Sequence, residues 1–183
     1  MRIPTPGLGL AIGAIAFAAC SEPAAPTRAA AKPGGSTIVE LAQGTSALST
    51  LVFAIGYSEA NCGTSFAATL GGAGGQYTVF APTNAAFATL IGAFGALGAP
   101  TVLSCDVLPA VLAFHVSRGR HTSTSVLSRK SILTLNGERA AVDGTTIASA
   151  PLNLGLVNIS ASNGIVHVVD GVLLPPSIVA ALN

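Results

Sequence analysis

The chain has 183 residues, half of them hydrophobic and 8% charged, and its formal net charge is +1. This length suits one folded domain with accessory segments, and the hydrophobic content excludes an intrinsically disordered chain. The low net charge excludes a general attraction to nucleic acid, and three His, three Cys and seven acidic residues are sparse material for a metal centre or a carboxylate-based active site.

The first 35 residues have the features of an export leader followed by a tether. Arg2 precedes an apolar run over 7–19, which is shorter than the ~20 residues of a membrane-spanning helix. We therefore predict a signal peptide over 1–19. Cys20 ends the sequence Phe-Ala-Ala-Cys, which resembles a bacterial lipobox, so it is the predicted lipidation site. Residues 20–35 are rich in Pro, Ala and Gly, as expected of a flexible tether.

Two localisations are compatible with this leader. In the first, the protein is a lipoprotein held at the outer membrane or cell surface through Cys20. In the second, the leader is cut near Ala19 and the product is periplasmic or secreted. Either route brings Cys62 and Cys105 into an oxidising compartment, where they can form a disulfide. Such a bridge would close a loop of roughly 40 residues and stabilise the fold by about 4 kcal/mol in the chain-entropy model. Two free buried thiols are the alternative.

Helix patterns come first in the folded part of the chain. One begins after Ser36-Thr37 and stops at Gly44, and a second carries an apolar stripe from Leu48 to Ile55 and ends at Gly56. The glycine-rich segment 71–75 precedes a strand pattern instead of opening a helix. It also lacks a following Lys-Ser/Thr, which argues against a phosphate-binding loop.

The segment 77–87, YTVFAPTNAAF, changes from a strand pattern to a helix pattern. Pro82 has no amide hydrogen to donate and is expected to end the strand. Thr83 is placed to cap a helix running from Asn84 to about residue 92. Another helix is indicated by the apolar stripe within 108–115.

Short strand patterns separated by turn sequences fill most of the rest. They are expected at 131–135, 139–142, 145–148, 154–160 and 164–170. Asn136-Gly137 and Asp143-Gly144 are typical hairpin turns, and a last helix is expected over 177–182. Helices first and strands later predict an α+β domain over 36–183 with mostly antiparallel pairing.

Three blocks of this sequence resemble the fasciclin (FAS1) domain family. YTVFAPTNAAF at 77–87 is similar to the first family signature, NGIVHVVDGVLLP at 163–175 to the second, and LAFHV at 112–116 to the family's Tyr-His block. The resemblance extends over 36–182 in the family's order. It implies a compact wedge of β-strands with flanking N-terminal helices. It also implies an adhesion or matrix-binding role in an exported or surface protein, without catalysis.

The resemblance marks eight residues as fold motifs: Thr83, Asn84, Phe87, His115, Asn163, Gly164, His167 and Asp170. We expect Thr83 and Asn84 to hold their turn through nearby backbone hydrogen bonds, and Asp170 to accept bonds from backbone amides. Both histidines lie on apolar faces, where a hydrogen-bonded core residue is more common than a ligand, so each ring nitrogen needs a partner. Phe114 stands where the family's block has a tyrosine, so any role of that hydroxyl is absent.

Basic residues gather in one part of a chain that is otherwise poor in charge. They are Arg118, Arg120, His121, Arg129, Lys130 and Arg139. As a binding patch they would attract an acidic partner, such as an anionic polysaccharide or lipid headgroups, and the binding would depend on salt. The alternative is a solvated loop that keeps the domain soluble.

Catalytic patterns are missing from the sequence. The segment 56–60 (GYSEA) lacks the second glycine of a nucleophile elbow, and no HExxH or acidic metal loop occurs. We therefore predict a non-catalytic interaction module of the fasciclin type, exported and lipid-anchored, with no cofactor or metal. The expected partner is an envelope or extracellular protein or polysaccharide, with the membrane contacted through the anchor. Nucleic acid is not expected, and self-association stays open.

Two other functions are compatible with the sequence. One is a periplasmic carrier or sensor of a small apolar ligand, for which a large dry internal cavity would be evidence. The other is an enzyme acting on envelope polymers, which would need an acid, base or nucleophile set converging in one cleft.

Overall fold

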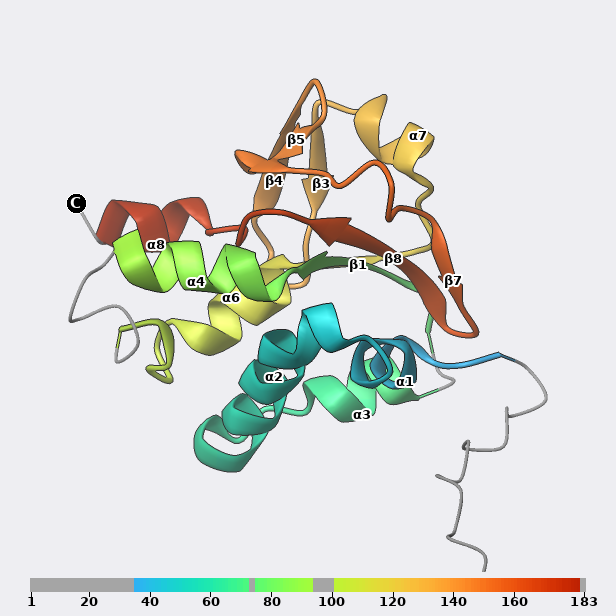
Figure 1. Ribbon diagram of the computed structural model, residues 1–183. Helices are drawn as coiled ribbons and strands as arrows, with labels where there is room; N and C mark the ends of the chain where they lie inside the picture. Colours follow the sequence, from blue (N-terminus) through green and yellow to red (C-terminus); the bar gives the residue numbers. More distant parts are fainter. Residues whose placement is uncertain (1–34, 73–74, 94–100, 182–183) are drawn as a thin grey trace, which may run out of the picture. The chain divides into compact units, whose positions relative to one another are not determined.

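The computed structural model describes residues 35–72, 75–93 and 101–181 (Figure 1). All of them belong to one compact unit, 31–183. The predicted signal peptide 1–19 and nearly all of the tether 20–35, with Cys20, lie outside the described residues. In the part of the chain that the structure describes, no helix combines the length and the hydrophobicity that crossing a bilayer requires.

A layer of short helices comes first. It consists of α1 (Ile38–Gln43), the 3-10 turn η1 (Ser46–Leu48), α2 (Ser49–Cys62) and α3 (Phe66–Gly71). A capping box starts α1, in which the Thr37 side chain accepts from the amide of Glu40 and the Glu40 carboxylate accepts from the amide of Thr37.

The predicted end of the second helix at Gly56 is wrong, because α2 continues to Cys62. A glycine inside a helix costs only about 1 kcal/mol relative to alanine, and the buried Leu51 and Ala54 anchor this helix in the core. The end comes at Gly63, whose φ of 65° is the left-handed conformation that stops helices.

The central sheet has the strand order β2-β1-β8-β7. Its strands are β1 (Tyr77–Pro82), β2 (Val116–Arg118), β7 (Ile159–Ala161) and β8 (Gly164–Val169). The two long strands β1 and β8 run parallel, with Tyr77 opposite Gly164 and Pro82 opposite Val169, whereas β2 and β7 pair antiparallel at the edges. Every residue of β1 and β8 is buried, so both faces of this pair are covered.

A second sheet, ordered β3-β4-β5-β6 and fully antiparallel, follows in the chain. Its strands are β3 (Ser131–Leu133), β4 (Arg139–Asp143), β5 (Thr146–Ile147) and β6 (Ala150–Pro151). The strand predicted at 154–160 is wrong over 154–158, and β7 begins only at Ile159. Leu154 and Leu156 are 57% and 48% exposed, so their hydrophobicity does not reflect a core position.

Four more helices complete the described part of the chain. They are α4 (Asn84–Ala93), α6 (Leu108–Phe114), α7 (Ser123–Leu127) and α8 (Pro176–Ala181). The sequence did not predict α3 or α7, since both span only about one and a half turns. Thr122 caps α7 by accepting from the amide of Ser125 at 3.3 Å.

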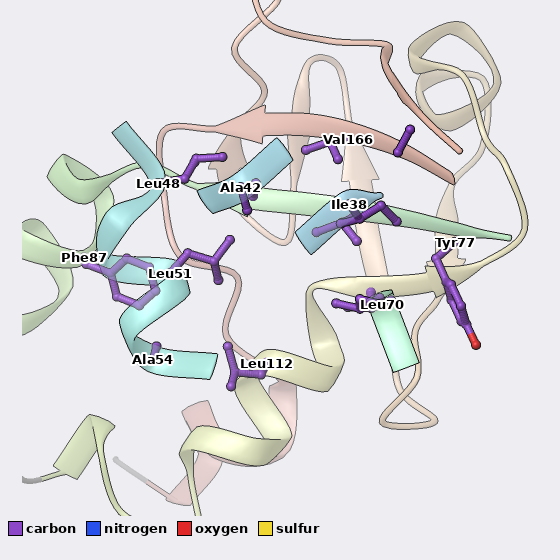
Figure 2. Packing of buried hydrophobic residues seen from close by; sticks show 14 of the residues in the cluster. Ile38, Ala42, Leu48, Leu51, Ala54, Leu70, Tyr77, Phe87, Leu112 and Val166 are labelled. Carbon is purple, nitrogen blue, oxygen red and sulfur yellow. The ribbon is translucent and has the colours of Figure 1, made fainter. Parts of the chain in front are cut away.

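The core consists of two clusters on the two faces of the central sheet. Alternation along β1 sends Val79 and Ala81 toward the helices and Phe80 toward the second sheet. The helix-side cluster also holds Phe87 of the first motif, which is 4% exposed (Figure 2). The helices, the central sheet and the second sheet therefore form an α+β domain of mostly antiparallel pairing, as predicted.

Alanine substitutions at Gly164 and Gly56 test whether the close approach of β8 to β1 contributes to the stability of the fold. A Cβ on Gly164 would overlap the carbonyl oxygen of Tyr77 and lie 2.8 Å from Ile38 Cδ1, whereas a Cβ on Gly56 would meet no atom within 4 Å. We expect Gly164→Ala to lower the unfolding free energy by about 3 kcal/mol. The matched Gly56→Ala should raise it by about 0.5–1 kcal/mol. Urea denaturation measures both, and equal effects would contradict the predicted overlap.

Candidate functional site

The junction between β1 and α4 connects the sheet to the helical layer. Thr83 Oγ1 accepts from the amide of Ala86 at 3.3 Å, as predicted for a cap. Asn84 behaves differently from the prediction, because its side chain binds the start of α2 and not its own turn. Its Oδ1 accepts from the amide of Thr50 at 2.9 Å, and its Nδ2 donates to the carbonyl of Ser46 at 2.9 Å. The first motif thus joins segments that are 34 residues or more apart.

Asn163 makes a second link between sheet and helices. This side chain is 2% exposed. Its Oδ1 accepts from the amide of Ile38 at 2.9 Å, while its Nδ2 donates to the carbonyls of Leu70 and of Gly72, the latter at 3.2 Å. One buried amide therefore binds the first turn of α1 and the end of α3, which explains its place in a fold motif.

His115 is a neutral core residue with both ring nitrogens occupied. It is 2% exposed, Nδ1 donates to the carbonyl of Val111 at 2.7 Å, and Nε2 accepts from the amide of Leu173 at 3.0 Å. These partners fix the tautomer with the proton on Nδ1. Desolvation by burial lowers the pKa of His115 from 6.5 to about 4, and the bond to Val111 offsets part of that shift.

His167 has the opposite tautomer and the same kind of role. Its Nε2 donates to the carbonyl of His121 at 2.8 Å, and its Nδ1 accepts from the amide of Asn158 at 3.2 Å. The ring stacks on Phe80 with 5.8 Å between centroids. Burial lowers its pKa, and the bond to His121 opposes that shift. Neither motif histidine has a nitrogen free for a ligand.

Asp170 departs from the prediction. Its carboxylate is exposed and accepts from the side-chain amide of Asn153 at 3.4 Å, and no described backbone amide donates to it. The reason is that β8 ends at Val169. The backbone amide of Asp170 still reaches the carbonyl of Pro151 at 2.9 Å, which leaves the carboxylate on the outside of the strand end.

Three of the six predicted patch residues line one open groove. Arg118 ends β2, His121 follows in the next loop, and Arg129 lies just beyond α7; together with residues of β3 and the β3–β4 turn they enclose about 350 Å³. No acidic residue lines this groove, so two exposed guanidinium groups give it positive charge. We call it the basic groove.

The other three patch residues lie outside the basic groove. Arg120 donates to the carbonyl of Ala161 at 3.0 Å and to Ser160 Oγ, and so it holds the edge strand β7. Lys130 is exposed next to Arg129 but does not line the groove. Arg139 lines a different groove, beside α8. Of the six predicted patch residues, three therefore line the basic groove, and binding by all six as one patch stays a prediction.

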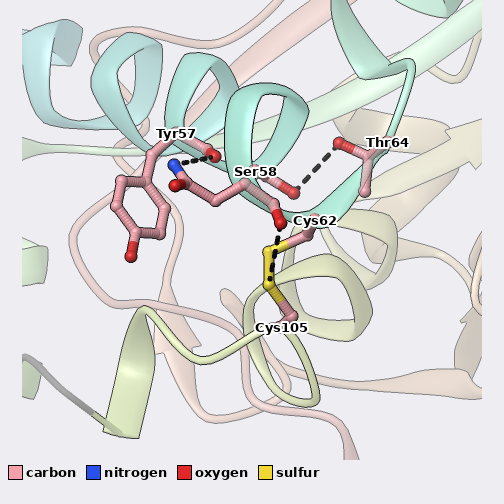
Figure 3. The surroundings of a disulfide bond; sticks show 6 residues. Tyr57, Ser58, Cys62, Thr64 and Cys105 are labelled. Carbon is pink, nitrogen blue, oxygen red and sulfur yellow. Dashed lines mark hydrogen bonds between the residues drawn. A yellow bond between two sulfur atoms is a disulfide. The ribbon is translucent and has the colours of Figure 1, made fainter.

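Cys62 and Cys105 form the predicted disulfide, with their Cα atoms 5.3 Å apart (Figure 3). It ties the last residue of α2 to the segment before α6, and this excludes the two free thiols. Next to it, Ser58 and Thr64 share a hydrogen bond of 3.0 Å between their hydroxyls. Among the described residues, no group of three or more His, Cys, Asp or Glu side chains could hold a metal ion.

The groove beside α8 was not predicted from the sequence. It is lined by residues of β4, of the β5–β6 turn and of 171–180, together with Phe114. These segments share no motif or periodicity, and most of the lining residues are Ala, Gly, Val or Leu. Arg139 and Phe114 are the lining residues that stood out in the sequence, and neither was connected with a groove.

The sequence model of the fasciclin domain family matches residues 47–175 of the chain. The chain belongs to the fasciclin domain family. It is 35% identical to the Synechocystis protein sll1483 over 92% of this chain and 90% of that protein. It is 36% identical to the cell surface glycolipoprotein MPB83 of Mycobacterium bovis over 57% of this chain, and spans 46% of MPB83. A solved fasciclin domain pair from the insect cell adhesion molecule fasciclin I matches 78% of this chain with a TM-score of 0.60 at 15% identity, and the match covers 52% of that structure.

The buried state of His115 predicts acid sensitivity. Above pH 6.5 the ring is neutral in both the folded and the unfolded state. As the pH falls from 6.5 to about 4, the unfolded chain binds a proton that the folded protein does not, so the unfolding free energy decreases, by up to about 3 kcal/mol. His167 acts in the same direction because its pKa is also lowered. Urea denaturation at several pH values between 6.5 and 4 measures how steeply the unfolding free energy falls.

His115→Gln is the control, because glutamine offers a donor and an acceptor but does not titrate. This variant should be less stable near pH 7 and lose less stability between pH 6.5 and 4. Carboxylate contributions are common to both proteins and cancel in the comparison. If the unfolding free energies of the two proteins fell in parallel with pH, His115 would not be the source of the acid sensitivity.

Proposed function

We propose that this protein is an exported, lipid-anchored and non-catalytic interaction module, and that its basic groove docks an anionic polysaccharide. The observation that carries the proposal is that Arg118 and Arg129 line the same open groove, which has no acidic lining residue. Neither guanidinium is paired with an acidic side chain among the described residues. Guanidinium groups bind carboxylates and sulfates in two-point contacts, so each can hold one acidic group of a polymer.

The rest of the groove suits a sugar chain better than a folded protein. Ile132 and Leu133 supply an apolar wall, and Leu133 is 53% exposed. A sugar ring can place its C–H face on such a surface while its acidic substituent reaches an arginine. The backbone carbonyl of Leu133 accepts from Ser117 Oγ at 2.8 Å, which fixes β3 against β2 and keeps the groove open without a partner.

Export and anchoring are supported by the leader and by the relatives. The relatives include a protein described as a cell surface glycolipoprotein and one described as a cell adhesion molecule. The disulfide between Cys62 and Cys105 also suits an oxidising compartment. Lipidation at Cys20 would hold the domain at a membrane by the tether that follows.

A carrier that encloses its ligand inside the core, or an enzyme, has less support. The internal cavity between the helices and the central sheet measures about 30 Å³, which is room for about one water molecule and not for an apolar ligand. Both motif histidines have their nitrogens occupied in the core. Ser58, the serine of the segment 56–60, is fully buried and bonded to Thr64.

Binding to polygalacturonate, a uronic acid polymer, tests the basic groove. We expect binding at low ionic strength that weakens at physiological salt, with no binding to neutral dextran. The double variant Arg118→Gln/Arg129→Gln should lose affinity by about tenfold, since each exposed charge contact contributes on the order of 0.5–1 kcal/mol. Lys130→Gln removes an adjacent charge outside the groove and should bind as the wild type. Equal losses in both variants would show that net charge, and not the groove, binds the polymer.

Membrane fractionation after expression in a bacterial host tests the anchor. We expect Cys20→Ala to move the protein from the membrane fraction to the soluble exported fraction, because the lipid has no other attachment site in the lipobox. Ser21→Ala, one residue later, should stay in the membrane fraction. Unchanged partitioning of the Cys20 variant would rule out lipidation at this residue.

A further inference from the structure

The groove beside α8 encloses about 600 Å³, a volume in the range of small-molecule sites, and shares no lining residue with the basic groove. Its walls are β4, the turn between β5 and β6, and the chain from Gly171 through α8, with Phe114 from α6 as a further lining residue. Unlike the small internal cavity, it opens to the surface. It is therefore accessible to a ligand without unfolding.

Small residues create this hollow. The lining includes Ala141, Ala148, Ala150, Gly171 and Ala180. A Cβ on Gly171 would lie 3.0 Å from the Cβ of Ala150, so glycine permits the chain after β8 to pack closely on β6. Larger side chains at the alanines would fill the space with their own carbon atoms, and the groove exists because they are absent.

The β5–β6 turn that borders the groove has an unfavourable backbone. Ala148 and Ser149 have φ angles of 47° and 68°, the left-handed region that two-residue hairpins normally fill with Asn or Gly. Both residues line the groove. Backbone strain of this kind in non-glycine residues concentrates at ligand-binding surfaces.

Arg139 is the one charged residue in a lining that is apolar apart from it and Ser149. Its Nη1 donates to Ser131 Oγ at 3.4 Å, a long and weak bond. Among the residues that the structure describes, no acidic side chain pairs with it. A permanent cation at the edge of an apolar groove is complementary to a molecule with one anionic end and a hydrocarbon body.

We propose that this groove binds a free fatty acid, with the carboxylate on Arg139 and the hydrocarbon chain along the alanine-rich walls. A neutral lipid would gain no charge attraction from the guanidinium. A second copy of the chain would have to bring an acidic side chain to the same position. The single cation and the mostly apolar lining together favour the fatty acid.

Calorimetric titration of the purified protein with decanoate below its micelle concentration tests this site, with 1-decanol and decyltrimethylammonium as ligands of equal chain length. We expect saturable binding of one decanoate, weaker binding of decanol, and the weakest binding of the cationic amphiphile. Arg139→Gln should reduce decanoate affinity roughly tenfold and leave decanol unchanged. Ala180→Phe should fill the groove and weaken both ligands.

Two matched variants separate the groove from general effects. Ala181→Phe places the same ring on α8 at an exposed residue that does not line the groove, and Arg129→Gln removes a cation from the basic groove. Both should bind decanoate as the wild type, and thermal melting verifies that all variants fold. The proposal is overturned by equal affinity for decanoate and decanol, by absence of binding, or by wild-type affinity in Ala180→Phe. Loss of a dimer in Ala180→Phe, seen by analytical ultracentrifugation, would show instead that a second copy covers the groove.

Discussion

The parallel pairing of β1 with β8 is the contact on which the rest of the domain depends. All six residues of each strand are buried, so the polar groups that these strands carry have no access to water. Burying a polar side chain without a partner is costly, and every such group must therefore find one within the protein. The positions of several loops follow from this requirement.

Thr78 and His167 show how the buried pair organises the surface. The Thr78 hydroxyl donates to the carbonyl of Gly119 at 2.8 Å and accepts from the amide of His121 at 2.9 Å. His167 in turn donates to the carbonyl of His121. The loop after β2 is thus bound at three backbone groups by side chains of the central strands. Because His121 belongs to this loop and Arg118 directly precedes it, one side of the basic groove is positioned by the core.

Local patterns predicted local structure well. The change of period at 77–87 gave β1, the cap at Thr83 and α4, and the apolar stripe near His115 gave α6. Several of the failures share a physical cause, which is that partners distant in the chain decide the outcome. Nothing near Asn84 in the sequence indicates that its amide binds the start of α2. The exposed leucines at 154 and 156 have the pattern of a strand but lack a sheet to cover them.

The same limit applies to the two grooves. Six basic residues close in sequence suggested one patch, but in the structure three of them line the basic groove and Arg139 lines the groove beside α8. Ile132 and Leu133 of β3 line the basic groove, whereas Arg139 and Ala141 of β4 line the groove beside α8. Leu133 and Arg139 are opposite each other in the β3–β4 register and share a face, so strand alternation does not separate the two grooves. The groove that each residue lines depends on the distant segment packed beside it, which is 117–129 for one groove and 171–180 for the other.

The β3–β4 hairpin therefore forms a wall of both grooves, and it is held firmly. The Glu138 carboxylate accepts from the amide of Ser177 at 3.1 Å, from Ser177 Oγ at 2.6 Å and from the Asn136 side chain at 3.1 Å. These bonds fix the hairpin turn to the first turn of α8, the opposite wall of one groove. A wall that is already ordered loses little conformational freedom when a ligand binds, so most of the contact energy is retained as affinity. Shallow surfaces with few charges can recognise a partner because so little conformational freedom is lost. The condition is a rigid scaffold in which the buried polar groups have hydrogen-bond partners, as they have in the β1–β8 pair.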